Sequence, residues 1–103
     1  MRVVWDPEAM KARTQVANYI RRQFGSKRKT RFLQEVRQVT QQSKRSPGIG
    51  QIDPLFVDRP QTYRSVIING LNKLVYFVSE DILYIAGFWD TRMDDGNQAS
   101  NVK

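Results

Sequence analysis

Residues 63–89 read YRSVIINGLNKLVYFVSEDILYIAGFW, three runs rich in β-branched and aromatic side chains separated by two turn signals. Asn69-Gly70 favours a tight hairpin because both residues tolerate positive φ, and Ser79-Glu80-Asp81 is the second polar break. The three runs are therefore predicted to form a three-stranded antiparallel meander, with strands at Tyr63–Ile68, Lys73–Val78 and Ile82–Trp89.

Two amphipathic helices are expected before the meander. Arg2–Trp5 is a short β-branched and aromatic run, and Asp6-Pro7-Glu8 after it supplies an N-cap, a first-turn proline and a first-turn acid. The first helix is predicted over about Pro7–Phe24 and ends at Gly25, and Ser26 caps the second, so the two form a helical hairpin. Apolar residues recur at spacings of three and four on both: Ala9, Ala12, Val16, Tyr19, Ile20 and Phe24, then Phe32, Leu33, Val36 and Val39.

Residues 43–61 lose this periodicity and are predicted to form a loop that crosses the molecule. Three of the four prolines lie in this segment, together with Gly48 and Gly50. Four of its apolar residues are expected to anchor the loop to the core: Ile49, Ile52, Leu55 and Phe56.

The order of elements predicts an α+β domain of the form β-α-α-β-β-β. An antiparallel sheet packs one face on the helical hairpin, and its other face stays available for function. The domain is expected to span residues 1–92, followed by a polar C-terminal tail over residues 93–103 that frays. One core is expected from alternate meander residues and the inward face of the hairpin: Val16, Ile20, Phe24, Phe32 and Val36.

Composition excludes several classes of protein. A chain of 103 residues suits one domain, and 40% hydrophobic residues argue against disorder of the whole chain. The absence of Cys and His excludes disulfide frameworks, thiol nucleophiles, Cys/His zinc sites and a Ser-His-Asp triad. We expect no metal and no cofactor. No apolar run reaches the roughly 18 residues of a membrane span and no signal-peptide pattern is present, so a cytoplasmic protein is expected.

The charge is basic and unevenly placed. The chain carries a net charge of +7, which suggests a polyanionic or acidic partner. Residues 1–50 hold twelve basic and three acidic residues, whereas residues 51–103 hold five basic and seven acidic ones. The basic field therefore belongs to the first half of the chain.

Five short motifs mark the ends of the expected elements: Asp6-Pro7-Glu8-Ala9, Ser46-Pro47-Gly48, Tyr63-Arg64, Lys73-Leu74-Val75-Tyr76 and Phe88-Trp89-Asp90-Thr91-Arg92. The most specific are a Tyr-Arg that opens a strand, a basic residue three before a Tyr, and an aromatic-x-x-Arg that closes the last strand. Together, over nearly the whole chain, they resemble the RelE/ParE superfamily of bacterial type II toxins, especially its ParE-like branch. The resemblance implies the same order of elements.

The resemblance also implies site residues. In ribosome-dependent RelE-type nucleases, basic residues on the sheet contact mRNA and stabilise the transition state, while a Tyr near the C-terminus is the general base. Arg64, Lys73 and Arg92 match three of those basic positions. A further basic position is Val66 here, and the terminal Tyr falls at about Gln98, so the chain departs from the nuclease pattern.

These three cations lie on different strands and could converge on one sheet face, where they would bind phosphate or a target protein. The alternative is that they are solvated, with Arg92 in a surface salt bridge. Asp90 is expected to orient Arg92 or to accept from a backbone N–H. Tyr76 is a candidate orienting residue and is expected to belong to the core.

Six cations with no acid between them straddle the expected turn of the helical hairpin. We call them the basic hairpin patch: Arg21, Arg22, Lys27, Arg28, Lys29 and Arg31. Such a patch attracts nucleic acid by counterion release, or keeps the protein soluble, or is covered by an acidic antitoxin segment.

The sequence therefore predicts the toxin of a type II toxin–antitoxin pair, held inactive by a cognate antitoxin that docks along the hairpin and sheet. By resemblance, a ParE-like poison of DNA gyrase that is not an enzyme is favoured. The terminal Tyr of the RelE-type nucleases and the C-terminal His-Tyr pair of other nuclease branches are both missing here. An mRNA interferase that acts at the ribosome is the first alternative. A basic nucleic-acid or protein binding module without toxicity is the second.

Overall fold

The computed structural model describes residues 1–92, 96 and 102. Its elements follow the predicted order, with one extra short strand and one 3-10 turn in the crossing loop. They are β1 (Arg2–Trp5), α1 (Pro7–Phe24), α2 (Ser26–Arg45), β2 (Gln51–Ile52), η1 (Pro54–Phe56), β3 (Arg64–Ile68), β4 (Asn72–Ser79) and β5 (Ile82–Asp90).

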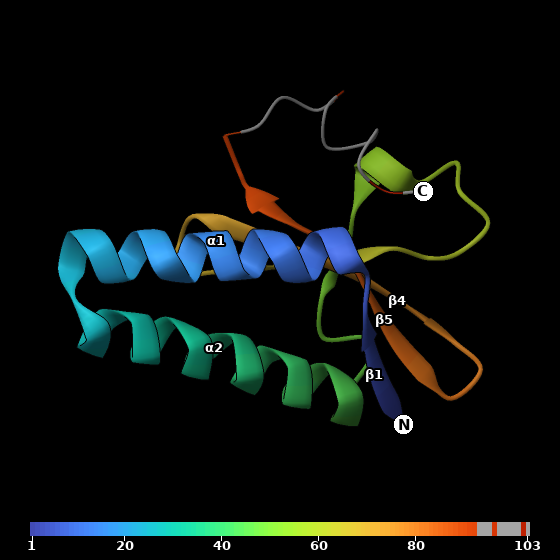
Figure 1. Cartoon of the computed structure of the whole chain (residues 1–103). Helices are drawn as coiled ribbons and strands as arrows, with labels where there is room; N and C mark the ends of the chain where they lie inside the picture. The colour runs from blue at the N-terminus through green and yellow to red at the C-terminus, as the bar shows by residue number, and fades with distance from the viewer. Residues whose placement is uncertain (93–95, 97–101, 103) are drawn as a thin grey trace.

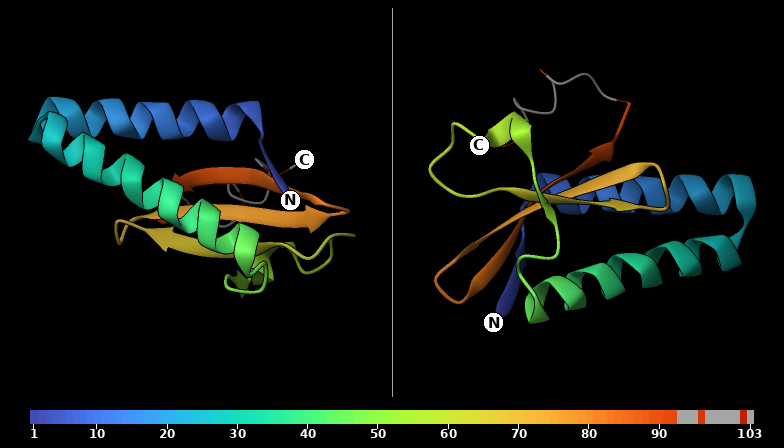
Figure 2. Two further views of the ribbon diagram at one scale, coloured as in Figure 1. Left: turned by 90° about the horizontal axis from the view of Figure 1, so that it is seen from below. Right: turned by 180° about the vertical axis from the view of Figure 1, so that it is seen from behind.

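The strands form one mixed sheet in the order β1-β5-β4-β3-β2. The predicted antiparallel meander is confirmed, because β3 pairs antiparallel with β4, and β4 with β5. The sheet as a whole is not purely antiparallel, since β1 lies parallel to β5 and pairs Val3 with Leu83. The chain between these two strands runs through α1, α2 and the strands β2, β3 and β4, which gives the long connection that a parallel pair requires. Both helices lie on the same side of the sheet (Figures 1 and 2).

Local sequence explains the helix ends. The Asp6 side chain accepts from the backbone N–H groups of Glu8 and Ala9 at 3.0 and 3.4 Å, which satisfies two of the free donors of α1. Gly25 has a φ of 96°, a conformation that glycine adopts without strain, and the chain reverses there. The expectation that Ser26 caps α2 is wrong: Gly25 holds the cap position, Ser26 is the first helical residue, and no side chain caps this end.

The predicted single core is in fact two clusters, one on each face of the sheet. On the helix-covered face, Leu74, Tyr76 and Phe88 pack under α1 and α2. On the second face, Val75 and Trp89 pack with Phe56 and Tyr63 from the crossing loop. Because β4 is apolar on both faces, burial requires a cover on each side. The second face is therefore closed over these residues rather than open as expected.

Phe24 is the one expected core residue that is wrong. Its side chain is 58% exposed, because it lies at the end of α1 next to the hairpin turn, which extends past the end of the sheet (Figure 1). Of the loop anchors, Phe56 is fully buried and Leu55 partly, whereas Ile49 and Ile52 are exposed.

The predicted tail falls mostly outside the described residues. Residues 93–95, 97–101 and 103 are not described. Val102 is buried in the second-face cluster, and its carbonyl accepts from Arg59 Nη1 at 2.8 Å. Neither helix of the described chain has an apolar stretch of the length that crossing a bilayer requires.

Candidate functional site

The three predicted cations are not brought together. Residues directly opposite each other on paired strands share a face. Lys73 lies opposite Trp89 and so points to the second face, whereas Arg64 lies opposite Tyr76 and points to the helix-covered side. Arg92 follows the end of β5. The expected convergence on one sheet face is therefore wrong, because the register places neighbouring candidates on opposite faces.

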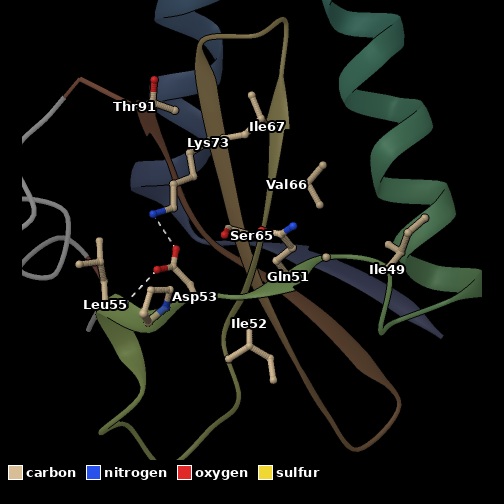
Figure 3. Close-up of a pocket in the computed structure, with 12 residues that line it drawn as sticks. Ile49, Gln51, Ile52, Asp53, Leu55, Ser65, Val66, Ile67, Lys73 and Thr91 are labelled. Atoms are coloured by element: carbon tan, nitrogen blue, oxygen red, sulfur yellow. Dashed lines mark hydrogen bonds and ion pairs between the residues drawn. The ribbon is translucent and has the colours of Figure 1, made fainter.

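Lys73 forms a buried ion pair with Asp53. Lys73 Nζ lies 2.6 Å from Asp53 Oδ2, and the two side chains are 14% and 2% exposed (Figure 3). Asp53 Oδ1 also accepts from Leu55 N at 3.0 Å and so begins η1. The pair thus ties the crossing loop to β4, beside a shallow pocket of about 620 Å³ lined by residues of β2, η1 and β3.

Arg64 is bound to the crossing loop. Its guanidinium donates to the carbonyl of Gly50 at 2.8 Å and reaches that of Gly48 at 3.5 Å. Tyr76 lies beside it, fully buried, as expected for a core residue. The Tyr76 hydroxyl donates to Pro47 O at 2.7 Å and accepts from Gly50 N at 3.0 Å. Both side chains therefore hold residues 47–50 against the sheet.

Arg92 and Asp90 form an exposed bidentate pair, the contact that the sequence predicts for Asp90. Arg92 Nε and Nη2 donate to the two carboxylate oxygens at 2.9 and 2.6 Å, and Arg92 N donates to Asp90 Oδ1 at 2.8 Å. The side-chain hydrogen bonds from Arg92, followed by its backbone N–H, lower the pKa of Asp90 to about 2. The same contact raises the pKa of Arg92.

A groove of about 940 Å³ runs between α1, β5 and the turn after β3. The Asp90–Arg92 pair forms part of its lining. Its lining mixes apolar and polar side chains, and Tyr19 within it is 52% exposed. This site was not predicted, because Tyr19 falls among the periodic apolar residues of the first helix and gives no sign of its exposure in the sequence. Asp53 was not predicted either, although an acid followed by Pro54 inside an apolar loop is a recognisable cap signal.

The basic hairpin patch occupies the turn between α1 and α2, as predicted. Five of its six residues are exposed and Lys29 is partly buried. Over the described part of the chain, no group of three or more His, Cys, Asp or Glu side chains gathers where a metal could bind. The groove and the basic hairpin patch are exposed, and their charge and shape suit them to binding macromolecules.

The structure defines the class of protein as a small basic α+β domain, with a helical hairpin on one face of a five-stranded sheet. The family model for the ParE toxin of the type II toxin–antitoxin system parDE matches residues 3–95. The chain therefore belongs to the ParE toxin family. Among solved structures, a chain of the chromosomal ParDE TA system from P. aeruginosa is similar, with a TM-score of 0.69 at 12% identity, covering 87% of this chain and 95% of that chain. None of the curated proteins matches.

This membership makes the chain a toxin of a type II toxin–antitoxin system, of the ParE-like kind. A cognate antitoxin is its partner in that system. Neither of the two alternative functions, the interferase and the module without toxicity, is favoured by these findings.

Proposed function

We propose that this toxin acts by binding DNA gyrase and that it catalyses no reaction. The observation that carries the proposal is the separation of the three cations: Lys73 points to the second face, whereas Arg64 points to the helix-covered side and Arg92 lies past the end of β5. A nuclease would need several cations around one phosphate to stabilise the charge that develops in the transition state. Two of the three are instead engaged with their own carboxylates, Asp53 and Asp90.

The proton-transfer groups support the same proposal. A general base works best when its pKa lies near the ambient pH. The pKa of Asp90 is about 2, because Arg92 holds the carboxylate in its charged form, so Asp90 is a weak base at neutral pH. The side chain of Tyr76 is buried, and its hydroxyl is hydrogen bonded to the loop. Neither of these two groups is thus well suited to act as a base for cleaving RNA.

The test sets the two targets side by side. Purified toxin is added to a supercoiling assay with gyrase and relaxed plasmid, and separately to ribosomes that translate a defined message. We expect inhibition of supercoiling and an intact message. Cleavage of the ribosome-bound message with normal supercoiling would contradict the proposal and restore the interferase alternative. A gyrase target also carries with it the cytoplasmic location expected from the sequence.

We further propose that the antitoxin occupies the groove between α1 and β5. An amphipathic helix that lays its apolar face into such a groove is a recurrent way of binding a peptide. Tyr19 supplies a half-exposed aromatic anchor, and the guanidinium of Arg92, 75% exposed, remains accessible to a carboxylate. An acidic amphipathic segment fits both features.

A further inference from the structure

The basic hairpin patch lies at an end of the molecule that the fold does not use. Its residues belong to the last turn of α1 and the first two turns of α2, at the far end of the hairpin from β1 (Figure 1). In the other views this turn again extends past the strands (Figure 2). The patch therefore projects from the body of the protein and is free to approach a large partner.

The charge of the patch is uncompensated. Between Glu8 and Glu35 the chain carries eight Lys and Arg residues and no acid. Within residues 1–92, 96 and 102, none of the six patch residues forms an ion pair. The first turn of α2 carries cations where the helix dipole favours acids, and no side chain caps it. The stability of the helix alone would favour different residues here, so the cations call for another explanation.

The chemistry of the patch identifies the kind of partner. A protein segment needs an apolar anchor as well as charge. Among residues 21–31, the only large apolar side chain is that of Phe24. It lines the α1–β5 groove and has the Arg28 guanidinium 5.2 Å from its ring centroid. A single strand of nucleic acid needs aromatic platforms for its bases. None of the six patch residues is aromatic, and the neighbouring ring of Phe24 already has the Arg28 guanidinium beside it. Phosphates on a duplex need only cations.

We propose that the basic hairpin patch binds the phosphate backbone of duplex DNA without sequence preference. The rigid hairpin presents its cations on two packed helices, which suits the regular backbone of a duplex. This inference rests on the proposed function: gyrase holds duplex DNA as it works, so a toxin bound to gyrase has DNA beside it. The patch would then hold the toxin on the enzyme–DNA complex rather than on the enzyme alone.

The first experiment measures binding of the purified toxin to a labelled duplex of about 20 base pairs by fluorescence anisotropy, between about 50 and 200 mM salt. Six phosphate contacts predict a slope of log affinity against log salt of about −5. The triple variant Lys27→Gln, Arg28→Gln, Lys29→Gln should reduce the size of this slope by about 3 and weaken binding at least about tenfold. Gln has a helix propensity close to those of Lys and Arg, so α2 is retained.

The matched control removes the same charge elsewhere. Arg2, Arg37 and Arg45 are exposed and lie outside the patch. The triple variant Arg2→Gln, Arg37→Gln, Arg45→Gln should lower affinity much less than the patch variant. Equal losses in the two triple variants would show that net charge alone attracts DNA, and would overturn the proposal.

Two further arms identify the partner. Single-stranded RNA and poly-L-glutamate replace the duplex in the same assay, and tighter patch-dependent binding to either would overturn the assignment to DNA. The target is tested separately, by toxin binding to gyrase without DNA. If the toxin binds gyrase but the patch variant binds DNA as tightly as the wild type, only this inference is contradicted. Patch-dependent DNA binding without any gyrase binding or inhibition would contradict only the proposed target.

Discussion

The two faces of the sheet are closed by different kinds of structure. One face is covered by two long helices. The other is covered by the crossing loop with its short 3-10 turn, by Tyr63 just before β3, and by Val102. An ion pair of a different kind lies at each face: Lys73–Asp53 is buried on the second face, and Asp90–Arg92 is exposed beside the helices. The apolar periodicity of the helices therefore predicts which face of the sheet they cover. It gives no sign that a loop closes the other face, because the loop has no periodic pattern.

The largest expected effect is on the helix-covered face. Phe88 is 2% exposed, and its ring centroid lies 6.1 Å from that of Phe32 and 6.4 Å from that of Trp5. Phe88→Ala should lower the free energy of unfolding by about 3 to 5 kcal/mol, because it removes a ring that joins α2 and β1 to β5. Chemical denaturation measures this loss. Phe24→Ala, which removes an exposed ring, is the control and should change stability by no more than about 0.5 kcal/mol.

The second face should respond less, and through its ion pair. Asp53→Asn removes the carboxylate that lies 2.6 Å from Lys73 Nζ in a largely buried place, which should cost about 2 kcal/mol, below the range for a fully buried pair because the Lys side chain keeps 14% exposure. Replacing both partners, Asp53→Asn with Lys73→Met, should recover part of the loss. A double variant that is less stable than Asp53→Asn alone would mean that Lys73 stabilises the fold through contacts other than the Asp53 carboxylate, and would contradict this prediction.

The fold was largely predictable from the sequence, and the reasons differ by region. The bounds of α1 follow from Asp6 and Gly25, and the turn after β3 follows from Asn69 and Gly70, which have φ values of 57° and 66°. These are local signals. The pairing of β1 with β5 depends on contacts far apart in the sequence, and no local pattern specifies them. Short β2 lies inside a segment whose prolines and glycines indicate only a loop.

The individual residues of the candidate site could be predicted from the sequence, but the directions of their side chains could not. Family motifs pointed to Arg64, Lys73 and Arg92, yet their directions depend on register, and a shift by one residue moves a side chain to the other face. The β4–β5 pairing also contains an irregularity at Val75 and Tyr76, which no turn or proline signals. The Asp90–Arg92 contact was predictable because the two residues are only two positions apart.

A smaller effect is expected at the groove on the helix-covered side. Tyr19→Ala should weaken binding of the cognate antitoxin by about tenfold while leaving the unfolding free energy within about 0.5 kcal/mol of the wild type, since the side chain is 52% exposed. Calorimetry with the purified pair measures the affinity. Val57→Ala is the control, because Val57 is 77% exposed and does not line the groove. Equal effects of the two substitutions would place the antitoxin elsewhere.

The smallest effect is expected at the exposed ion pair, and it contrasts most sharply with the buried one. The pKa of Asp90 is about 2 against an ordinary value of 3.8, because Arg92 donates to the charged carboxylate. Since the pKa is depressed in the folded protein, the interaction is present above the ordinary pKa and is lost as the pH falls through about 2. Arg92→Ala should return the pKa of Asp90 toward 3.8, as followed by carboxyl NMR, with no measurable change in stability at neutral pH.

An unchanged pKa of Asp90 in this variant would mean that the backbone N–H of residue 92, which the substitution retains, holds the carboxylate on its own. The buried pair on the second face would then be the only one of the two in which a side-chain cation matters.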